Sequence, residues 1–517
     1  MKNIRILWTD DEIEILKPHI LFLEEKGYEL NTCTNGVDTI DMVEAGSYDI
    51  IFLDENMPGM SGIDTLKAIK EINPDIPVVM ITKSEEENIM DAAIGSKIAD
   101  YLIKPVNPNQ ILLSIKRITE RGRLINEKTT NDYQAEFNNI RMMTDAASSF
   151  DDWIDLYRKL VYWDLELDNS TDSAIREILE IQEKEANASF GKFISNEYLS
   201  LFEKGNNSRP VLSPDLLKDS LFPLIKNGEN VFFILIDNLR YDQWKVMQSE
   251  ISSILRILDD KLYYSILPTA TQYARNSIFA GMMPMEIEKE MPRLWIRDDE
   301  EEGKNRFEED LLKENLRRNR IDCRWSYHKI SNNTQGKKVI DTLHDLLAND
   351  LTVLVYNFVD MISHARTDSG LIRDIADDEP AYRSLTRSWF IHSPLMDLLR
   401  KLQGEKIKIV ITTDHGTIRV TNPVKVIGDR KTSSNLRYKL GKNLDYSPKQ
   451  VFEIKQPKSA HLPLSNITST YIFARSYDFL VYPNNYNHVA NYFRNTFQHG
   501  GISMQEMIVP VATLEPL

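Results

Sequence analysis

Short apolar runs alternate with amphipathic segments in two separate parts of this 517-residue chain. The first part covers about residues 1–120, and the second begins near Pro210 and continues to the C-terminus. The run Ile50-Ile51-Phe52-Leu53 is apolar at every position, which is typical of parallel strands that helices cover on both faces. The alternation therefore predicts an α/β fold, with a doubly wound sheet in the first part and one large α/β domain in the second.

The clearest strand predictions are spread over both parts of the chain. They are residues 4–8, 49–53, 78–81, 101–103, 231–236, 351–358 and 407–411. A late apolar run, 507–511, contains Pro510. Because proline has no backbone N–H to donate, we expect this last strand at the edge of its sheet.

Between these two parts the strand patterns disappear. Apolar residues such as Trp153, Leu156 and Leu160 recur at helical spacing, with charged residues between them. This pattern predicts a helical bundle that connects the two α/β parts. Residues 204–210 are rich in Gly, Asn and Pro, which is typical of a boundary. We therefore expect three domains, at residues 1–120, 121–205 and 206–517.

Composition narrows the classes of function. The formal net charge of −16 disfavours non-specific wrapping of nucleic acid, which needs a basic surface, and no DNA-binding helix-turn-helix motif is evident. The two cysteines, Cys33 and Cys323, lie too far apart for a disulfide framework or a CxxC metal site, which fits a reducing compartment. No apolar run approaches the ~18 residues that span a bilayer. We expect a cytoplasmic protein without membrane insertion.

Polar residues follow four predicted strands of the first part. Asp10 and Asp11 follow the first strand, and Asp54, Thr82 and Lys104 each follow a later one. The carboxyl ends of parallel strands meet at one edge of the sheet, so these side chains should converge. Three carboxylates repel one another unless a cation joins them, and oxygen ligands suit Mg²⁺. A lysine ammonium and a threonine hydroxyl could then bind a phosphoryl group.

This set resembles the receiver domain of two-component response regulators, which has a flavodoxin-like fold. The resemblance implies that a sensor histidine kinase phosphorylates Asp54, which adds about −1.5 to −2 charge and promotes a homodimer. The implied Mg²⁺ ligands are Asp10, Asp11, Asp54 and the backbone of Asn56. The implied switch and phosphate-binding residues are Thr82, Tyr101 and Lys104. A cis peptide bond before Pro105 is also expected from this family.

Acids and histidines also follow the predicted strands of the second part. The candidate ligands are Asp237, Thr271, Asp360, His364, Asp414, His415 and His499. Each one alone could be a turn residue or a helix cap. Together, imidazole and carboxylate groups suit Zn²⁺ or Mn²⁺, and two ions about 3.5–4 Å apart can clamp the attacking and leaving oxygens of a phosphoryl transfer. The ordered set therefore predicts a site for two metal ions.

The order of these residues resembles the alkaline phosphatase superfamily, and most closely its PglZ branch, in which the segment His499-Gly500-Gly501 is typical. The resemblance implies that Asp360, His364 and His499 bind one ion. It implies that Asp237, Thr271, Asp414 and His415 bind the other. Thr271 is then the nucleophile, because the second threonine of the Pro-Thr-x-Thr motif has this role in the family. His461 is the spare ligand if His499 lies elsewhere.

Residues 419–442 contain seven basic residues and one acidic residue. This segment is either a solvated insertion or a flap that faces a polyanion, in which Arg430 and Arg437 could bind phosphate bidentately.

We therefore expect a phosphodiesterase that acts on nucleotide or oligonucleotide phosphodiesters under the control of Asp54. The alternative is a metal-stabilised platform that binds a sigma factor or a nucleotide signal with little catalysis. The combination of receiver, connector and PglZ domain resembles a family of regulators linked to type IX secretion, which implies contact with a secretion-system component.

Overall fold

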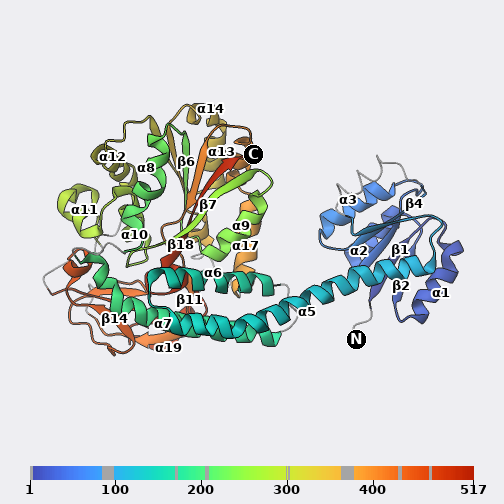
Figure 1. Ribbon diagram of the computed structural model, residues 1–517, viewed down its shortest axis with the longest axis horizontal. Coiled ribbons are helices and arrows are strands. Elements are labelled where there is room, and N and C mark those ends of the chain that lie inside the picture. Colours follow the sequence, from blue (N-terminus) through green and yellow to red (C-terminus); the bar gives the residue numbers. More distant parts are fainter. Residues whose placement is uncertain are drawn as a thin grey trace. The chain divides into compact units, whose positions relative to one another are not determined.

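The computed structural model describes residues 4–83, 98–168, 173–203, 209–297, 300, 303–362, 378–428, 433–464 and 468–517, with backbone alone at 113, 116–117, 119–131 and 173. The chain divides into two compact units, Met1–Asp132 and Tyr133–Leu517 (Figure 1). Among the helices of these described ranges, none is long and apolar enough to cross a membrane.

The first unit contains a five-stranded parallel sheet in the order β2-β1-β3-β4-β5. Its strands are β1 (Arg5–Thr9), β2 (Glu29–Cys33), β3 (Ile50–Asp54), β4 (Val78–Thr82) and β5 (Asp100–Ile103). The helices between and after them include α1 (Lys17–Glu25), α2 (Gly36–Ala45), α3 (Gly62–Ile72) and α5 (Pro108–Ala146). This strand order is that of flavodoxin-like folds, so the fold expected for this part is confirmed.

Both faces of this sheet are buried, because neighbouring residues of each strand point to opposite sides. Trp8 packs on one face with Ile111 of α5, and α1 lies on the same face. Leu7 packs on the other face with Leu66 of α3, and α2 lies beside it. The apolar runs of the sequence thus correspond to strands that are covered on both sides.

The second unit begins with three helical segments. They are the C-terminal part of α5, α6 (Phe150–Leu167) and α7 (Ser173–Glu197). Ser149 and Asp152 form a capping box that starts α6. Phe190 of α7 contacts the Trp153 ring of α6 at 5.4 Å between ring centres and stacks on Tyr264 at 6.5 Å. The helical connector is confirmed, whereas the boundaries at 120 and 205 stay predictions; residue 120 lies inside α5.

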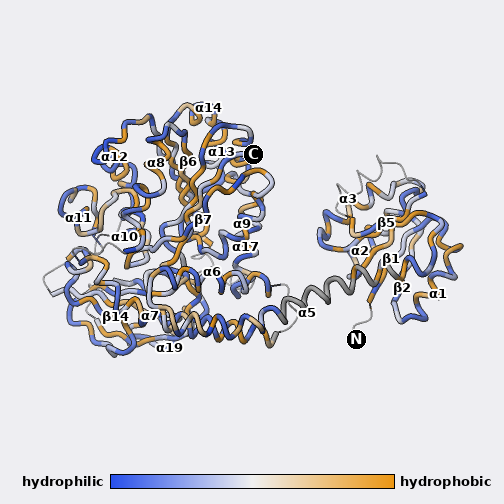
Figure 2. The backbone as a smooth tube through the Cα atoms, in the orientation of Figure 1, coloured by the Kyte–Doolittle hydropathy of each residue, from blue (hydrophilic) through white to orange (hydrophobic). Residues whose placement is uncertain are grey.

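The main sheet of the second unit has the strand order β7-β18-β10-β6-β9-β8 (Figure 1). The strands are β6 (Val231–Ile236), β7 (Leu255–Tyr264), β8 (Trp325–Ile330), β9 (Leu351–Tyr356), β10 (Lys408–Thr412) and β18 (Ile508–Pro516). The four strands β10, β6, β9 and β8 are parallel. Figure 2 shows that hydrophobic residues concentrate along β6 and the strands beside it. The strands predicted in this part are therefore present, although β9 ends at Tyr356 and not at Phe358 as predicted.

Helices cover both faces of the main sheet: α8, α10 and α12 lie on one side, and α9, α13 and α17 on the other (Figure 1). The helices are α8 (Phe222–Lys226), α9 (Tyr241–Ile251), α10 (Thr271–Ala280), α11 (Pro284–Glu290), α12 (Glu308–Arg318), α13 (Asn333–Asp341), α14 (Leu343–Leu346), α17 (Glu379–Ile391), α18 (Pro394–Lys401), α19 (Tyr486–Phe493) and α20 (Met504–Met507). Three small sheets contain β11 (Ile418–Arg419), β12 (Asn422–Lys425), β13 (Tyr438–Gly441), β14 (Val451–Ile454), β15 (Thr470–Ala474), β16 (Asp478–Val481) and β17 (Phe497–Gln498).

The strand that contains Pro510 is not at an edge, so that expectation was wrong. β18 lies between β7 and β10 and is antiparallel to both. Its pairing with β10 begins at Val511, and the Pro510 carbonyl accepts a hydrogen bond of 2.8 Å from the Thr412 hydroxyl. Proline is tolerated here because its missing N–H lies where the ladder with β10 ends.

Candidate metal centres

The receiver-like pocket lies at the carboxyl edge of the first sheet. Asp10, Asp11 and Asp54 each offer a carboxylate oxygen, and these oxygens all lie within 4.8 Å of one another. The ammonium group of Lys104 pairs with Asp10 at 2.8 Å and with Asp54 at 2.9 Å. The predicted convergence of these four side chains is therefore present in the structure.

The pKa values of the two central groups of this pocket, Asp54 and Lys104, are both raised, for different reasons. Burial raises the pKa of Asp54, as do Asp10 and Asp11, whereas the hydrogen bond from Lys104 lowers it; the net direction is upward. Burial lowers the pKa of Lys104, but its bonds to Asp10 and Asp54 outweigh burial and the pKa is raised. The three carboxylates carry more negative charge than Lys104 can balance, so a divalent cation would be stabilised among them. Carboxylate oxygens are also the ligands that Mg²⁺ prefers.

The two residues expected to act as a switch, Thr82 and Tyr101, belong to the neighbouring strands β4 and β5. The hydroxyl of Thr82 donates a hydrogen bond to the carboxylate of Glu55, a contact that the sequence did not indicate. The Tyr101 side chain is 36% exposed. Asn56 follows β3 and is exposed, and the peptide bond before Pro105 is cis, as expected.

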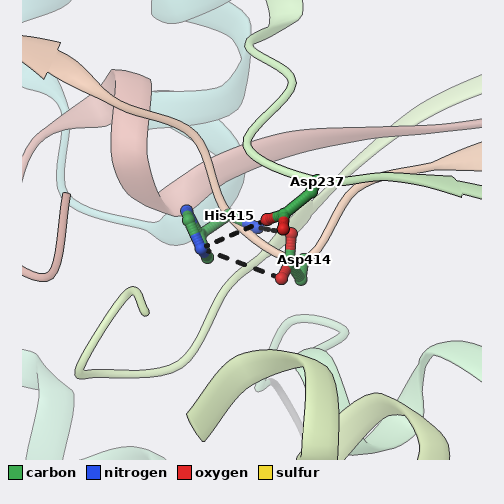
Figure 3. Close-up of side chains that lie close together, drawn as sticks. All are labelled: Asp237, Asp414 and His415. Atoms are coloured by element: carbon green, nitrogen blue, oxygen red, sulfur yellow. Dashed lines mark hydrogen bonds and ion pairs between the residues drawn. The ribbon is translucent and has the colours of Figure 1, made fainter. Parts of the chain in front are cut away.

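In the second unit, three of the predicted ligands meet at the carboxyl ends of β6 and β10 (Figure 3). Asp237 directly follows β6, while Asp414 and His415 follow the neighbouring strand β10. Nε2 of His415 lies 3.9 Å from Oδ1 of Asp237 and 3.7 Å from Oδ2 of Asp414. Thr271 is the first residue of α10, and its Oγ1 lies 3.1 Å from the same His415 nitrogen. The parallel strands thus bring together residues that are far apart in the sequence.

Two further predicted ligands, Asp360 and His499, lie beside this group. Nε2 of His499 is 3.8 Å from Oδ1 of Asp360, and the rings of His499 and His415 stack at 4.3 Å between centres. The same Asp360 oxygen accepts a hydrogen bond of 3.3 Å from the Asn238 side chain. His364 lies outside the described residues.

The hydrogen bonds of both histidines suit metal binding. Nδ1 of His415 lies 3.1 Å from the Gly416 carbonyl, and Nδ1 of His499 lies 3.2 Å from the Thr269 carbonyl. A carbonyl can only accept, so each neutral ring carries its proton on Nδ1 and presents the Nε2 lone pair to the site. In addition, Oδ1 of Asp237 is buried and has no hydrogen-bond partner among the residues that the structure describes. A divalent cation would satisfy these groups, so the residues present fit the expected metal.

Arg275 of α10 is a member of this site that the sequence patterns did not indicate. Its guanidinium pairs with Asp237 and donates from Nε to Oδ2 of Asp414 at 3.0 Å. Burial raises the pKa of Asp237 well above its usual range, although Arg275 acts against this. The pKa of Asp414 is lowered: burial acts to raise it, but the Arg275 guanidinium, together with the hydrogen bond from the Asn238 amide, outweighs burial. A buried arginine with two ligand aspartates can be recognised only from the folded chain.

The loop that carries His499 is held by buried hydrogen bonds. The Gly500 amide donates to the Thr269 hydroxyl, which in turn donates to the Gly501 carbonyl. Gly500 has a φ of +119°, and a Cβ there would lie 2.8 Å from the Tyr438 ring. A side chain at this position would therefore be strained, which favours glycine there.

Arg437 does not bind phosphate, and that expectation was wrong. Its guanidinium is fully buried and donates to Glu506 at 3.1 and 2.6 Å. Glu506 also accepts the Gly501 amide, so this ion pair holds the His499 loop instead of facing a ligand. Arg430, the other candidate, lies outside the described residues. His461 lies beside Glu286 at 3.3 Å and contacts the Phe202 ring, so it is not next to the ligand group.

Family models match the chain in three consecutive segments. Residues 6–116 match the response regulator receiver domain, residues 123–202 match the PorX response regulator linker domain, and residues 216–514 match the BREX system PglZ alkaline phosphatase-like domain. The last segment is more than half of the chain. The chain belongs to the PglZ family. Its three segments together form a PorX-like response-regulator architecture, and both of its α/β parts are of kinds that generally bind divalent metals.

The relatives match about a quarter of this chain. The transcriptional regulatory protein ZraR of Klebsiella oxytoca is 31% identical over 136 residues, which are 26% of this chain and 31% of that protein. A CpxR homolog of Haemophilus influenzae is 30% identical over 140 residues, which are 27% of this chain and 60% of that protein. The solved structure of the Vibrio cholerae chemotaxis protein CheY4 is 26% identical and covers 22% of this chain and 98% of its own, with a TM-score of 0.22. This chain spans less than two thirds of the length of the two curated relatives.

Proposed function

We propose that this chain is a two-component response regulator in which phosphorylation of Asp54 controls a phosphodiesterase in the PglZ domain. A sensor histidine kinase supplies the phosphoryl group. The receiver pocket holds Mg²⁺ through Asp10, Asp11, Asp54 and the backbone of Asn56. The effector site holds two Zn²⁺ or Mn²⁺ ions through the aspartates and histidines that were expected from the sequence, with His364 completing the set.

The observation that carries the proposal is the position of Thr271. Its hydroxyl lies 3.1 Å from Nε2 of His415, next to the buried pair Asp237 and Asp414. It is also the first residue of α10, where the amides of Thr271 and Gln272 have no acceptor within the helix. Amides at a helix N-terminus bind phosphoryl oxygens. A nucleophile and a phosphate-binding group therefore lie at the same place.

Thr269 does not have these properties. It is fully buried, and its hydroxyl is used by the Gly500 amide and the Gly501 carbonyl. We infer that Thr269 positions the His499 loop and that Thr271 attacks phosphorus. The new bond joins Thr271 Oγ to phosphorus as the hydroxyl loses its proton, and the bond from phosphorus to the departing alkoxide breaks; the alkoxide takes up a proton and leaves as an alcohol. Water then attacks the phosphorus that remains on Thr271, which releases a phosphate monoester and restores the Thr271 hydroxyl. Bound divalent ions would supply charge stabilisation for the attacking and leaving oxygens.

Substitution of Thr271 tests this proposal. In Thr271→Val the side chain keeps its shape but loses its hydroxyl, so hydrolysis of bis(p-nitrophenyl) phosphate with Zn²⁺ or Mn²⁺ should fall about 10³-fold or more. Thr342→Val, at an exposed threonine of the same domain, should keep full activity. Full activity in Thr271→Val would exclude this mechanism. Absence of turnover in the wild type, with binding of a sigma factor or a nucleotide retained, would support the binding platform instead.

The substrate class is a nucleotide or oligonucleotide phosphodiester, and the proposed cellular context is type IX secretion. Support for a diester comes from the basic segment, in which Lys425 and Lys442 remain exposed although Arg437 and Lys439 are buried. Among the residues that the structure describes, we identify none that corresponds to the arginine with which monoesterases of the superfamily bind a terminal phosphate. The diester above should therefore be hydrolysed faster than p-nitrophenyl phosphate, and a preference for the monoester would contradict this assignment.

A further inference from the structure

Arg275 lies one helical turn after Thr271 on α10, and its side chain is 1% exposed. Each of its guanidinium nitrogens faces an oxygen of another side chain. Nε donates to Asp414 at 3.0 Å, and Nη2 pairs with Asp237. Nη1 donates to Asn357 at 3.2 Å and lies 3.5 Å from Glu308. One rigid fork therefore connects two of the predicted metal ligands to Asn357, which follows β9, and to Glu308 of α12.

Arg275 lies near three carboxylates, those of Asp237, Asp414 and Glu308, and only Glu308 has a second cation beside it among the described residues. Glu308 already has a cation, because Lys329 lies 3.2 Å from it, and the Tyr327 hydroxyl donates a hydrogen bond to it as well. Most of the Arg275 charge is therefore available to Asp237 and Asp414. These two carboxylates are almost fully buried, so without a counter-charge their mutual repulsion would be weakly screened.

The contacts also fix the orientation of each carboxylate. Arg275 pairs with Oδ2 of Asp237. The other oxygen of Asp237, Oδ1, faces His415 and has no hydrogen-bond partner among the described residues. On Asp414, Oδ1 accepts the amides of Asn238 and His415, while Oδ2 accepts Arg275. Contacts within the protein thus hold both carboxylates in place.

We propose that Arg275 is a positioning residue that acts as a built-in counter-charge for the metal-free site. It holds Asp237 and Asp414 in their ligand orientation and keeps the site folded when no ion is bound. The inference rests on the proposed function only in treating these two aspartates as metal ligands. It predicts that the metal makes a larger contribution to stability once the arginine charge is removed.

The test compares thermal unfolding of the full chain with and without Zn²⁺ or Mn²⁺. In Arg275→Met, the melting temperature of the metal-free protein should fall by several degrees, and added metal should recover most of this loss. Arg275→Lys keeps the charge but not the fork and should fall between the wild type and Arg275→Met. Arg383→Met is the matched control, since Arg383 is equally buried and pairs with Asp164, Asp168 and Asp242 away from the ligand group.

The control should lose the same stability with and without metal, and the same behaviour in Arg275→Met would overturn the proposal. A double variant covers the case in which Arg275→Met fails to fold. Asp237→Asn removes one of the charges that Arg275 compensates, so the metal-free double variant should be more stable than Arg275→Met alone; strictly additive losses would reject the inference. These readouts need no substrate. Wild-type protein that binds no metal would refute the proposed function but leave the double-variant test valid.

Discussion

Lys439 is a buried ammonium group in β13. It is 1% exposed, lies 4.3 Å from the ring centre of Tyr482, and donates to the Ser433 carbonyl at 3.2 Å. Burial lowers its pKa to about 7. In the unfolded chain a lysine has a pKa of about 10.4, so the unfolded state binds more protons than the folded state between about pH 7 and 10. The free energy of unfolding should therefore rise with pH across this range.

Lys439→Met should remove this dependence. Methionine fills a similar volume without a charge, so the variant should be more stable than the wild type near pH 7, and the difference should shrink as the pH rises. The change can reach about 1.4 kcal/mol for each pH unit. Urea unfolding at pH 7, 8 and 9 measures it, with the exposed Lys442→Met as the control. Parallel profiles for the wild type and Lys439→Met would show that the lysine does not titrate in this range.

At the scale of elements, the connector and the PglZ sheet share one apolar core. Phe190 of α7 is fully buried and contacts both Trp153 of α6 and Tyr264 of β7. The Tyr264 hydroxyl donates to the Phe150 carbonyl at 2.7 Å. The helices and the sheet of the second unit should therefore unfold together.

Phe190→Ala tests this shared core. Removal of a buried aromatic ring typically costs about 3–5 kcal/mol, through lost burial and the cavity that remains. Ile181→Ala, at an exposed position of the same helix, should change the free energy of unfolding far less. Denaturant unfolding followed by far-ultraviolet circular dichroism measures both variants. A loss of helix signal in Phe190→Ala with the sheet intact would show that the connector folds separately.

At the scale of the whole molecule, phosphorylation is expected to change the oligomeric state. Asp54 and Lys104 are paired in the structure, and Thr82 is bonded to Glu55. A phosphoryl group on Asp54 adds about −1.5 to −2 charge beside the Glu55 carboxylate and competes for the Thr82 hydroxyl. The receiver must therefore rearrange around its carboxyl edge when it is phosphorylated.

Light scattering with and without beryllofluoride measures this effect. The wild type should shift toward twice the monomer mass, because the acyl phosphate mimic binds at Asp54 and drives the rearrangement. Asp54→Asn should stay at the monomer mass, whereas Asp75→Asn, at an exposed position of the same unit, should respond like the wild type. Equal masses for the wild type in both conditions would contradict the expected dimer.

Most strands of the two larger sheets, and the polar residues that follow them, could be predicted from the chain itself, whereas β2, β7, β8 and the strands of the small sheets were missed. A strand that is buried on both faces needs apolar residues throughout, and β3 and β6 show this as continuous runs. Polar residues that interrupt the pattern at the end of a strand, such as Asp54 and Asp237, mark the carboxyl edge where ligands bind. These features are local, so the order of residues along the chain is sufficient to reveal them.

The partners of the buried charges were decided only by the tertiary structure. Arg275 is 139 residues from Asp414, and Arg437 is 69 residues from Glu506. Neither arginine has a local pattern that distinguishes it from a surface residue, which is why Arg437 was mistaken for a phosphate ligand. The interior position of β18 likewise could not be predicted, because it is possible only where Pro510 lies just beyond the residues that pair with β10. A buried charge is stable only beside its counter-charge, and which groups meet is known only after the chain has folded.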